Sequence, residues 1–270
     1  GENRDGQIGD GTEKARLTPV QIAKGIKFKQ ISAATYSGFA IDSEGNLWAW
    51  GQNNFAQLGD ETRIDKNSPV QVISGTYFKD ISAGENHSLA IDSEGNLWGW
   101  GDSSYGQAGV KNGIRTPGKI KEETKFMEIS AGREYSLAID SEGKLWAVGY
   151  NYFGQLGDGT TVDKNSFIQI ASDKKFVHIF SGDSRSFGID NEGNTWAWGK
   201  SGYFLGIGTY DEKVLVPMQV KIETKLNLIK SNGCNLALDI DGSMWAWGYN
   251  GNGQYGNGTK DSVGIPIQIK

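Results

Sequence analysis

Side chains that could carry catalysis or bind a metal are sparse in this sequence. Its 270 residues include two histidines, His87 and His178, and one cysteine, Cys234. Two histidines provide little material for acid–base chemistry or a metal centre. A single cysteine excludes a disulfide or a cysteine-based zinc cluster within this sequence. We therefore expect no enzyme active site, no metal and no cofactor.

Two short motifs resemble ligand-binding loops but lack the required context. Residues 251–256 read Gly-Asn-Gly-Gln-Tyr-Gly, which matches a dinucleotide-binding fingerprint. That fingerprint needs a strand before it and a helix after it to direct backbone amides at a pyrophosphate, and neither is expected here. Residues 239–243 begin like a calcium loop but lack its later oxygen ligands and closing glutamate. We interpret both motifs as parts of repeated turns.

All nine tryptophans belong to one five-residue motif that recurs along the chain. It reads Leu-Trp-Ala-Trp-Gly at 47–51, and its variants occupy 97–101, 145–149, 195–199 and 244–248. The first tryptophan recurs after 50, 48, 50 and 49 residues. Such a period is typical of propellers and solenoids. Because the motif is apolar on both faces, we expect these tryptophans to be buried between repeats.

Each repeat predicts four short strands and no helix. In the second copy, β-forming segments at 78–84, 88–92 and 97–101 are separated by turn residues, including a Ser-Glu-Gly turn at 93–95. A fourth segment carries a proline, which places it at a sheet edge, and its copies occupy 18–22, 68–72, 216–220 and 265–269. We predict an all-β fold: a β-propeller of four-stranded antiparallel blades, with five complete blades plus an extra outer strand.

The repeat resembles that of the regulator of chromosome condensation family, and the resemblance covers essentially the whole chain. It rests on Ile-Ser-Ala-Gly, Leu-Ala-Ile-Asp, Gly-Asn-Leu-Trp-Ala-Trp-Gly and the Gly-Gln-Leu-Gly-Asp-Gly-Thr of 154–160. The Gly-Gln-Leu-Gly element recurs with variations, but the fourth full copy departs from it as Phe204-Leu205-Gly206. The resemblance implies a propeller, commonly of seven blades, that serves as a protein-binding platform.

The repeats predict a single propeller domain over residues 1–270. The expected repeat units are approximately 1–25, 26–75, 76–123, 124–173, 174–223 and 224–270. The first unit is partial, because it holds a loop and an outer strand without three strands before them. We expect the chain to belong to a larger, seven-bladed ring that is completed by missing sequence or by another chain. A closed ring of five or six blades is the alternative.

Composition disfavours several classes of partner. The net charge is −5 and the 27 basic residues are scattered, which argues against nucleic acid. No apolar run approaches 18 residues and no leader opens the sequence, so we expect no membrane insertion. The regularity of the repeats resembles bacterial members of the family. We expect an extracellular or cell-surface bacterial location in preference to a cytoplasmic one.

Two loops differ from repeat to repeat, namely those after the first and the third strands. The strand order places both on one face, opposite the constant Asp-Ser-Glu-Gly turn. Their aromatic, basic and acidic side chains are typical of protein interfaces. We therefore predict a non-catalytic module that binds a protein partner through Tyr36, Glu85, His87, Arg133, Tyr135, Tyr150, Tyr152, Asp183, Arg185 and Tyr249.

The loops leave alternative interpretations open. His87 is also interpreted as a residue that hydrogen-bonds locally, and Phe55, Tyr105, Phe153 and Tyr203 either pack against the adjacent turn or join the binding surface. The founding member of the family implies nucleotide exchange on a small GTPase, with Glu85, His87 and Asp183 as working residues. The even repeat spacing leaves no room for the inserted wedge of an exchange factor. Inhibition of a secreted enzyme such as a β-lactamase, implied by a bacterial propeller with these repeats, is the other alternative.

Overall fold

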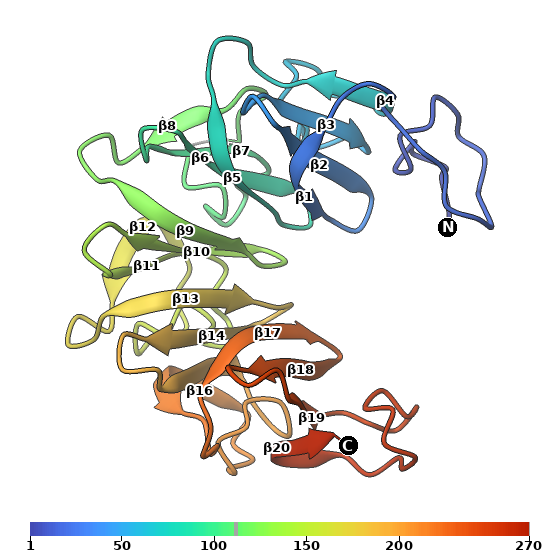
Figure 1. Cartoon of the computed structure of the whole chain (residues 1–270). Coiled ribbons are helices and arrows are strands. Elements are labelled where there is room, and N and C mark those ends of the chain that lie inside the picture. The colour runs from blue at the N-terminus through green and yellow to red at the C-terminus, as the bar shows by residue number, and fades with distance from the viewer. Residues whose placement is uncertain (111–112, 270) are drawn as a thin grey trace. The chain divides into compact units, whose positions relative to one another are not determined.

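The computed structural model describes residues 1–110 and 113–269, and these contain strands and turns but no helix. Twenty strands form five four-stranded antiparallel sheets, in which consecutive strands are neighbours (Figure 1). The strands are β1 (Phe28–Ala33), β2 (Ser37–Asp42), β3 (Leu47–Gly51), β4 (Lys66–Gln71), β5 (Phe78–Ala83), β6 (His87–Asp92), β7 (Leu97–Gly101), β8 (Gly118–Ile120), β9 (Phe126–Ala131), β10 (Tyr135–Asp140), β11 (Leu145–Gly149), β12 (Lys164–Ile170), β13 (Phe176–Ser181), β14 (Arg185–Asp190), β15 (Thr195–Lys200), β16 (Lys213–Gln219), β17 (Leu226–Asn232), β18 (Cys234–Asp239), β19 (Met244–Gly248) and β20 (Val263–Ile269). The predicted blades of four antiparallel strands are confirmed.

The chain divides into two compact units, Gly1–Ser136 and Leu137–Lys270. The boundary lies within β10, the second strand of the third sheet. Each of the five sheets falls within one of the repeat spans expected from the sequence.

Burial within a sheet is greatest at its second and third strands. Every residue of β2, β6, β10 and β14 is buried, whereas the first strand β1 alternates between partly buried and exposed residues. The third strands are buried except at their first tryptophan, at Met244 in β19 and at Lys200, the last residue of β15. The apolar Leu-Trp-Ala-Trp sequence therefore suits a strand that is covered on both faces.

The two tryptophans of each motif occupy different environments. The second tryptophans are at most 8% exposed, and each donates its indole N–H, over 2.7 to 3.0 Å, to a carbonyl 43 residues earlier. The first tryptophans are half-buried and bond an aspartate six residues earlier. The prediction of buried tryptophans is confirmed in full for the second tryptophans and in part for the first, which are partly buried. The first tryptophans lie at the hairpin end of the strand, where solvent has access.

The loop that receives the indole needs glycine at a defined place. Trp100 Nε1 donates to the Gln57 carbonyl over 2.7 Å, and Gly59 follows that carbonyl with a φ of +75°. A Cβ at Gly59 would lie 2.7 Å from Trp100 Nε1. The positive φ and the close approach together explain the second glycine of the Gly-Gln-Leu-Gly element.

The constant aspartate of each repeat organises the hairpin between the second and third strands. Asp92 Oδ1 accepts backbone N–H groups from Glu94 and Asn96, at 3.0 and 2.8 Å. Its Oδ2 accepts from Asn96 Nδ2 at 2.7 Å and from Trp98 Nε1 at 2.9 Å. The aspartates of the other repeats, Asp42, Asp140, Asp190 and Asp239, make the corresponding bonds to their turns and indoles. The repeated carboxylates are therefore structural.

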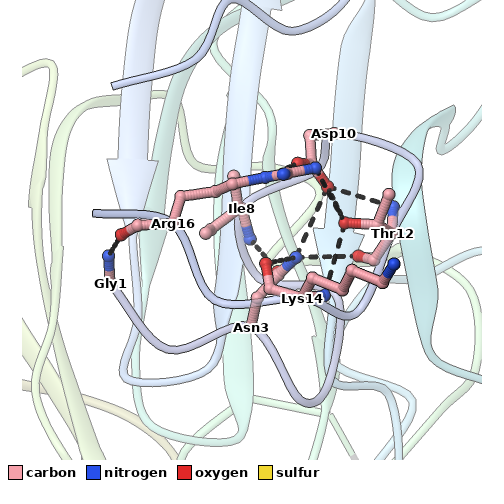
Figure 2. Close-up of polar contacts among 7 residues, drawn as sticks. All are labelled: Gly1, Asn3, Ile8, Asp10, Thr12, Lys14 and Arg16. Carbon is pink, nitrogen blue, oxygen red and sulfur yellow. Dashed lines mark hydrogen bonds and ion pairs between the residues drawn. The ribbon is translucent and has the colours of Figure 1, made fainter. Parts of the chain in front are cut away.

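The N-terminal residues form a loop and not an outer strand. Residues 18–23 adopt no strand, so the predicted extra outer strand is wrong, and no described strand pairs with this segment. Figure 2 shows the loop that precedes it, in which Asn3 Oδ1 accepts from Ile8 N at 2.8 Å and Asn3 Nδ2 donates to the Thr12 carbonyl at 2.8 Å. Trp50 Nε1 donates to the Gln7 carbonyl over 3.0 Å. The N-terminal copy of the repeat loop, which is additional to the loops of the five sheets, thus packs on the first sheet without a strand of its own.

We expect Trp100→Ala to lower the free energy of unfolding by about 3 to 5 kcal/mol, because it empties a fully buried site and removes a buried hydrogen bond. Trp98→Ala, in the same strand, should cost less because that ring is half-buried. Urea unfolding followed by circular dichroism measures both variants. Equal losses in the two variants would contradict the distinction between the two tryptophan positions.

The turn aspartates predict loss of stability in acid. Burial opposes ionisation of Asp42, Asp92 and Asp190, but hydrogen bonds from the indole, the turn side chains and the backbone outweigh it and lower each pKa. At Asp239 the bond from Trp245 is the largest cause of a lowered pKa. A carboxyl whose pKa is depressed by folding stabilises the fold above its unfolded pKa of about 3.9, and this stabilisation is lost as the pH falls through the folded pKa.

Unfolding free energy should therefore fall steadily as the pH is lowered below about 4. Asp92→Asn should flatten this dependence, whereas Asp241→Asn, at an exposed turn position, should leave it unchanged. Urea titrations between about pH 5 and pH 2.5 measure the effect. A wild-type protein that is equally stable across that range would refute the assignment.

Candidate functional site

Two sets of loops lie together at one end of the sheets. We call the loops between first and second strands inner loops, and those between third and fourth strands outer loops. Backbone bonds join the two loops within a repeat: Gln52 N to the Tyr36 carbonyl at 2.9 Å, and Lys200 N to the Ser184 carbonyl at 2.8 Å. These bonds confirm, within those repeats, that the two variable loops share a face.

A buried asparagine holds most of the outer loops in shape. Asn151 Oδ1 accepts from Leu156 N at 3.0 Å, and Asn151 Nδ2 donates to Asp158 Oδ1 at 3.0 Å and to the Thr160 carbonyl at 3.1 Å. We call this arrangement the asparagine clamp, and it recurs at Asn3, Asn53 and Asn250. The clamp fixes the loop backbone, so that the variable side chains are presented from a defined framework.

The fourth outer loop lacks the asparagine clamp. Trp198 donates to the Gln155 carbonyl and Trp247 to the Phe204 carbonyl. Gln155 and Phe204 are therefore equivalent positions, and the third and fourth outer loops can be aligned on them. In this alignment, four polar residues of the third outer loop have different counterparts in the fourth: Asn151 corresponds to Ser201, Gln155 to Phe204, Asp158 to Ile207 and Asp163 to Lys213. The fourth outer loop therefore differs from the third in several residues together, and it shares the loss of the clamp asparagine with the second outer loop, which has Ser103 at that place.

Most of the predicted contact residues are accessible. Tyr36, Tyr152, Asp183, Tyr249 and Arg133 are exposed. In the first unit, Arg133 Nε lies 2.8 Å from Glu85 Oε2, so that ion pair links two inner loops. In the second unit, Tyr150 is half-buried and stacks on Tyr152 with ring centroids 6.4 Å apart.

Three predicted contact residues are buried. His87, Tyr135 and Arg185 are 1%, 0% and 6% exposed, and each is the first residue of a second strand. Tyr135 packs over Gly132, where a Cβ would lie 2.3 Å from the ring. The expectation that Tyr135 and Arg185 project from the loops is wrong, because a side chain at this strand position points into the repeat. Arg185 lies over the Phe204 ring, 4.1 Å from its centroid.

His87 belongs to a buried hydrogen-bond chain. Its Nε2 lies 2.8 Å from Ser136 Oγ, and that hydroxyl donates to the Gln107 carbonyl over 2.8 Å. Because the serine hydrogen is used on the carbonyl, Nε2 carries the imidazole proton. Burial lowers the His87 pKa to about 4 against the opposing charge of Asp102, so the ring is neutral at neutral pH. His87 is therefore hydrogen-bonded within the structure, as the alternative interpretation expected, but its partner lies in a strand of the next repeat and is not local.

The structure brings together a cluster that the sequence-based prediction missed. We call Tyr150, Tyr152, Phe153, Lys200 and Lys213 the aromatic–lysine cluster. Lys213 Nζ lies 3.7 Å from the Tyr152 ring centroid, and Lys200 Nζ lies 5.0 Å from that of Phe153. Tyr152 and Phe153 meet edge to face at 5.0 Å. The one signal in the sequence is the lysine at 213, where the first and third outer loops have aspartate.

No group of three or more histidine, cysteine, aspartate or glutamate side chains within residues 1–110 and 113–269 is placed to hold a metal ion. Burial raises the pKa of the Cys234 thiol, so it is not poised as a thiolate nucleophile. Over the same residues there is no helix with the length and hydropathy to cross a bilayer.

Comparison with known proteins identifies the fold and a family. A family model described as an RCC1-like domain matches residues 1–270. No curated protein gives a significant match. The crystal structure of human WBSCR16 is 19% identical with a TM-score of 0.83, over 93% of this chain and 69% of that one.

Two yeast structures are also similar. Yeast RCC1 (Prp20) bound to Kap60 is 20% identical with a TM-score of 0.78, over 92% of this chain and 62% of that one. Prp20p from Saccharomyces cerevisiae, whose structure is described with its binding properties to Gsp1p and histones, is 21% identical with a TM-score of 0.75, over 92% and 64%. At these identities the likeness shows the fold, and the chain spans about two thirds of these relatives.

The buried imidazole predicts a pH dependence of stability. A histidine whose pKa is depressed by folding stabilises the fold above its unfolded pKa of about 6.5, and that contribution is lost as the pH falls toward the folded value. His87→Gln should remove the slope of unfolding free energy between pH 6.5 and about 4 that this residue causes. His178→Gln, at an exposed position, is the matched control. Identical slopes in wild-type and His87→Gln proteins, measured by urea titration, would contradict the assignment.

Proposed function

Because the chain belongs to the RCC1-like domain family, we propose that it is a non-catalytic module that binds a protein partner through its inner and outer loops. The observation that carries the proposal is the contrast between the two ends of the repeats. At the hairpin end, the same aspartate turn is built in every repeat. At the loop end, exposed side chains differ from one repeat to the next, and such variety suits recognition of an unlike partner.

The contact residues that we propose are the accessible ones. In the first unit these are Tyr36 and the Glu85–Arg133 pair. In the second unit they are Tyr150, Tyr152, Asp183 and Tyr249. Aromatic side chains on a fixed backbone lose little conformational entropy on binding, and tyrosine is enriched among interface hot spots. The buried His87 and Tyr135 would support the loops of the first unit from beneath, and Arg185 would do so in the second unit.

The structures of relatives support a binding role. Yeast RCC1 was solved with Kap60 bound, and Prp20p is described as binding Gsp1p and histones. Those partners belong to those proteins. The variety of these partners is consistent with a fold in which the loops, and not the sheets, determine binding specificity.

Nothing in the geometry favours nucleotide exchange over simple binding. Of the three residues that exchange would use, His87 is buried and neutral, and Glu85 is engaged with Arg133. Asp183 is the exposed member. Inhibition of a secreted enzyme is one form of partner binding, and it would use the same loops.

The test is affinity purification of partners with the wild-type chain, followed by measurement of the affinity for the partner so identified. We expect Tyr152→Ala combined with Tyr249→Ala to weaken binding by about 2 kcal/mol or more, with little change in melting temperature. Asp241→Ala, on the hairpin end of the same unit, should bind as the wild type does. Unchanged affinity in the tyrosine variant with a lowered melting temperature would show that these side chains are structural.

A further inference from the structure

Two lysines of the aromatic–lysine cluster face each other, and neither has an acidic partner among residues 1–110 and 113–269. Lys200 at the end of β15 and Lys213 at the start of β16 are directly opposite across the strand pair. Like charges in this position repel each other. Asp211 and Glu212 lie just before Lys213, yet within the described part of the chain neither forms an ion pair with either lysine.

Lysines of other outer loops are engaged differently. Lys66 Nζ lies 3.1 Å from Asp60 Oδ2, and Lys164 Nζ lies 3.0 Å from Asp158 Oδ2. Those two lysines thus neutralise the aspartate of the asparagine clamp. In the fourth outer loop Ile207 replaces that aspartate, so the corresponding carboxylate is missing from the sequence.

The side chain at position 213 also does not make the hydrogen bond that its counterparts make in other outer loops. At the equivalent positions, Asp65 and Asp163 accept the backbone N–H of the clamp asparagine at 2.7 and 2.8 Å, and Ser262 does so at 2.9 Å. In the fourth loop, the N–H of Ser201 is satisfied by the Glu212 carbonyl at 3.0 Å. The side chain at 213 is therefore not required to hold the loop, and its positive charge needs another explanation.

Part of the aromatic surface beside the lysines is accessible. Tyr152 is 51% exposed although Lys213 covers part of its ring at 3.7 Å. Tyr150 stacks on Tyr152 at an interplanar angle of 16°, and Phe153 lies 5.7 Å from Lys213. Contact with the rings holds the ammonium groups in place by cation–π attraction. The cluster therefore presents two fixed positive charges beside exposed aromatic surface.

We propose that the aromatic–lysine cluster binds an extended acidic segment of a protein partner. Carboxylates of the segment would lie against Lys200 and Lys213 and relieve the repulsion between them, while an apolar or aromatic side chain of the segment would pack on Tyr150 and Tyr152. The proposal rests on the proposed function. It narrows the binding surface to the third and fourth outer loops and the partner to one with a negatively charged segment. Exposed lysines of this kind contribute to association rate and specificity, and their effect is sensitive to salt.

The direct test uses defined peptides and does not depend on knowing the natural partner. The probe is a fluorescent peptide of four glutamate–tyrosine pairs, compared by anisotropy with peptides in which glutamine or lysine replaces glutamate. We expect the glutamate peptide to bind the wild-type chain about tenfold more tightly than the glutamine peptide, and this preference to shrink as salt is raised from about 50 to 300 mM. Equal binding of the glutamate and glutamine peptides would overturn the proposal.

Variants then locate the site. Lys200→Gln combined with Lys213→Gln should abolish the preference for the glutamate peptide, and Lys230→Gln, at an exposed position of β17, should keep it. The melting temperature of the double variant should not fall, because a repulsive pair is removed. A fall in melting temperature with unchanged peptide preference would assign the two lysines a structural role and overturn the proposal. Heparin is the comparison ligand. If heparin binds more tightly than the glutamate peptide and depends on the same two lysines, the proposal of an acidic protein segment is overturned in favour of an anionic polysaccharide.

The two proposals can fail separately. If a partner is captured and is lost in the Tyr152→Ala and Tyr249→Ala variant but retained in the double lysine variant, loop-face binding stands and the acidic segment is refuted. If the peptides discriminate as expected but no captured partner depends on the loop tyrosines, the cluster stands as a binding site and the wider loop surface is refuted.

Discussion

The hydrogen bond from a buried indole to the loop of the preceding repeat is the interaction on which the rest of the structure depends. A repeat cannot satisfy its second tryptophan alone, because the acceptor is a backbone carbonyl 43 residues earlier. A buried indole N–H or carbonyl without a partner costs about 1 to 3 kcal/mol. The bond fixes a loop against the next sheet at four places, and in the third repeat, where Val148 replaces the tryptophan, Ser136 Oγ donates to the Gln107 carbonyl.

Several other features of the sequence serve the same carbonyl. A hydroxyl at the second position of the second strand donates to it as well, as Ser88 does to Gln57 and Ser186 to Gln155, at 2.9 and 2.7 Å. Where the loop has Phe204 in place of glutamine, Asn235 donates to the same backbone oxygen at 2.7 Å. The acceptor is part of the backbone, so the loop side chain can change without loss of the bond. This freedom allows the outer loop of a repeat to change in sequence while the bond is kept.

A loop fixed at its base is a good carrier of variable side chains. The carbonyl bond and the asparagine clamp hold the outer loop, so exposed side chains such as Tyr152 are carried by an ordered backbone, and such order reduces the entropic cost of any association. The fourth repeat keeps the carbonyl bond but replaces the clamp, and its lysine reaches the aromatic residues of the third outer loop. The departure alters the surface while the sheet beneath it is preserved.

The sequence by itself determined the repeat, the four-stranded sheets, the turn aspartates and the shared face of the two variable loops. These follow from periodicity and strand order, which are local properties. Only the tertiary structure decided that His87, Tyr135 and Arg185 are buried. Each is the first residue of a strand and follows a loop directly, and the sequence does not say whether its side chain is covered by an adjacent element. It also decided that residues 18–23 form no strand, since a strand exists through its partner. Lys213 and Tyr152 are 61 positions apart, and only the packing of successive outer loops brings that charge onto that ring.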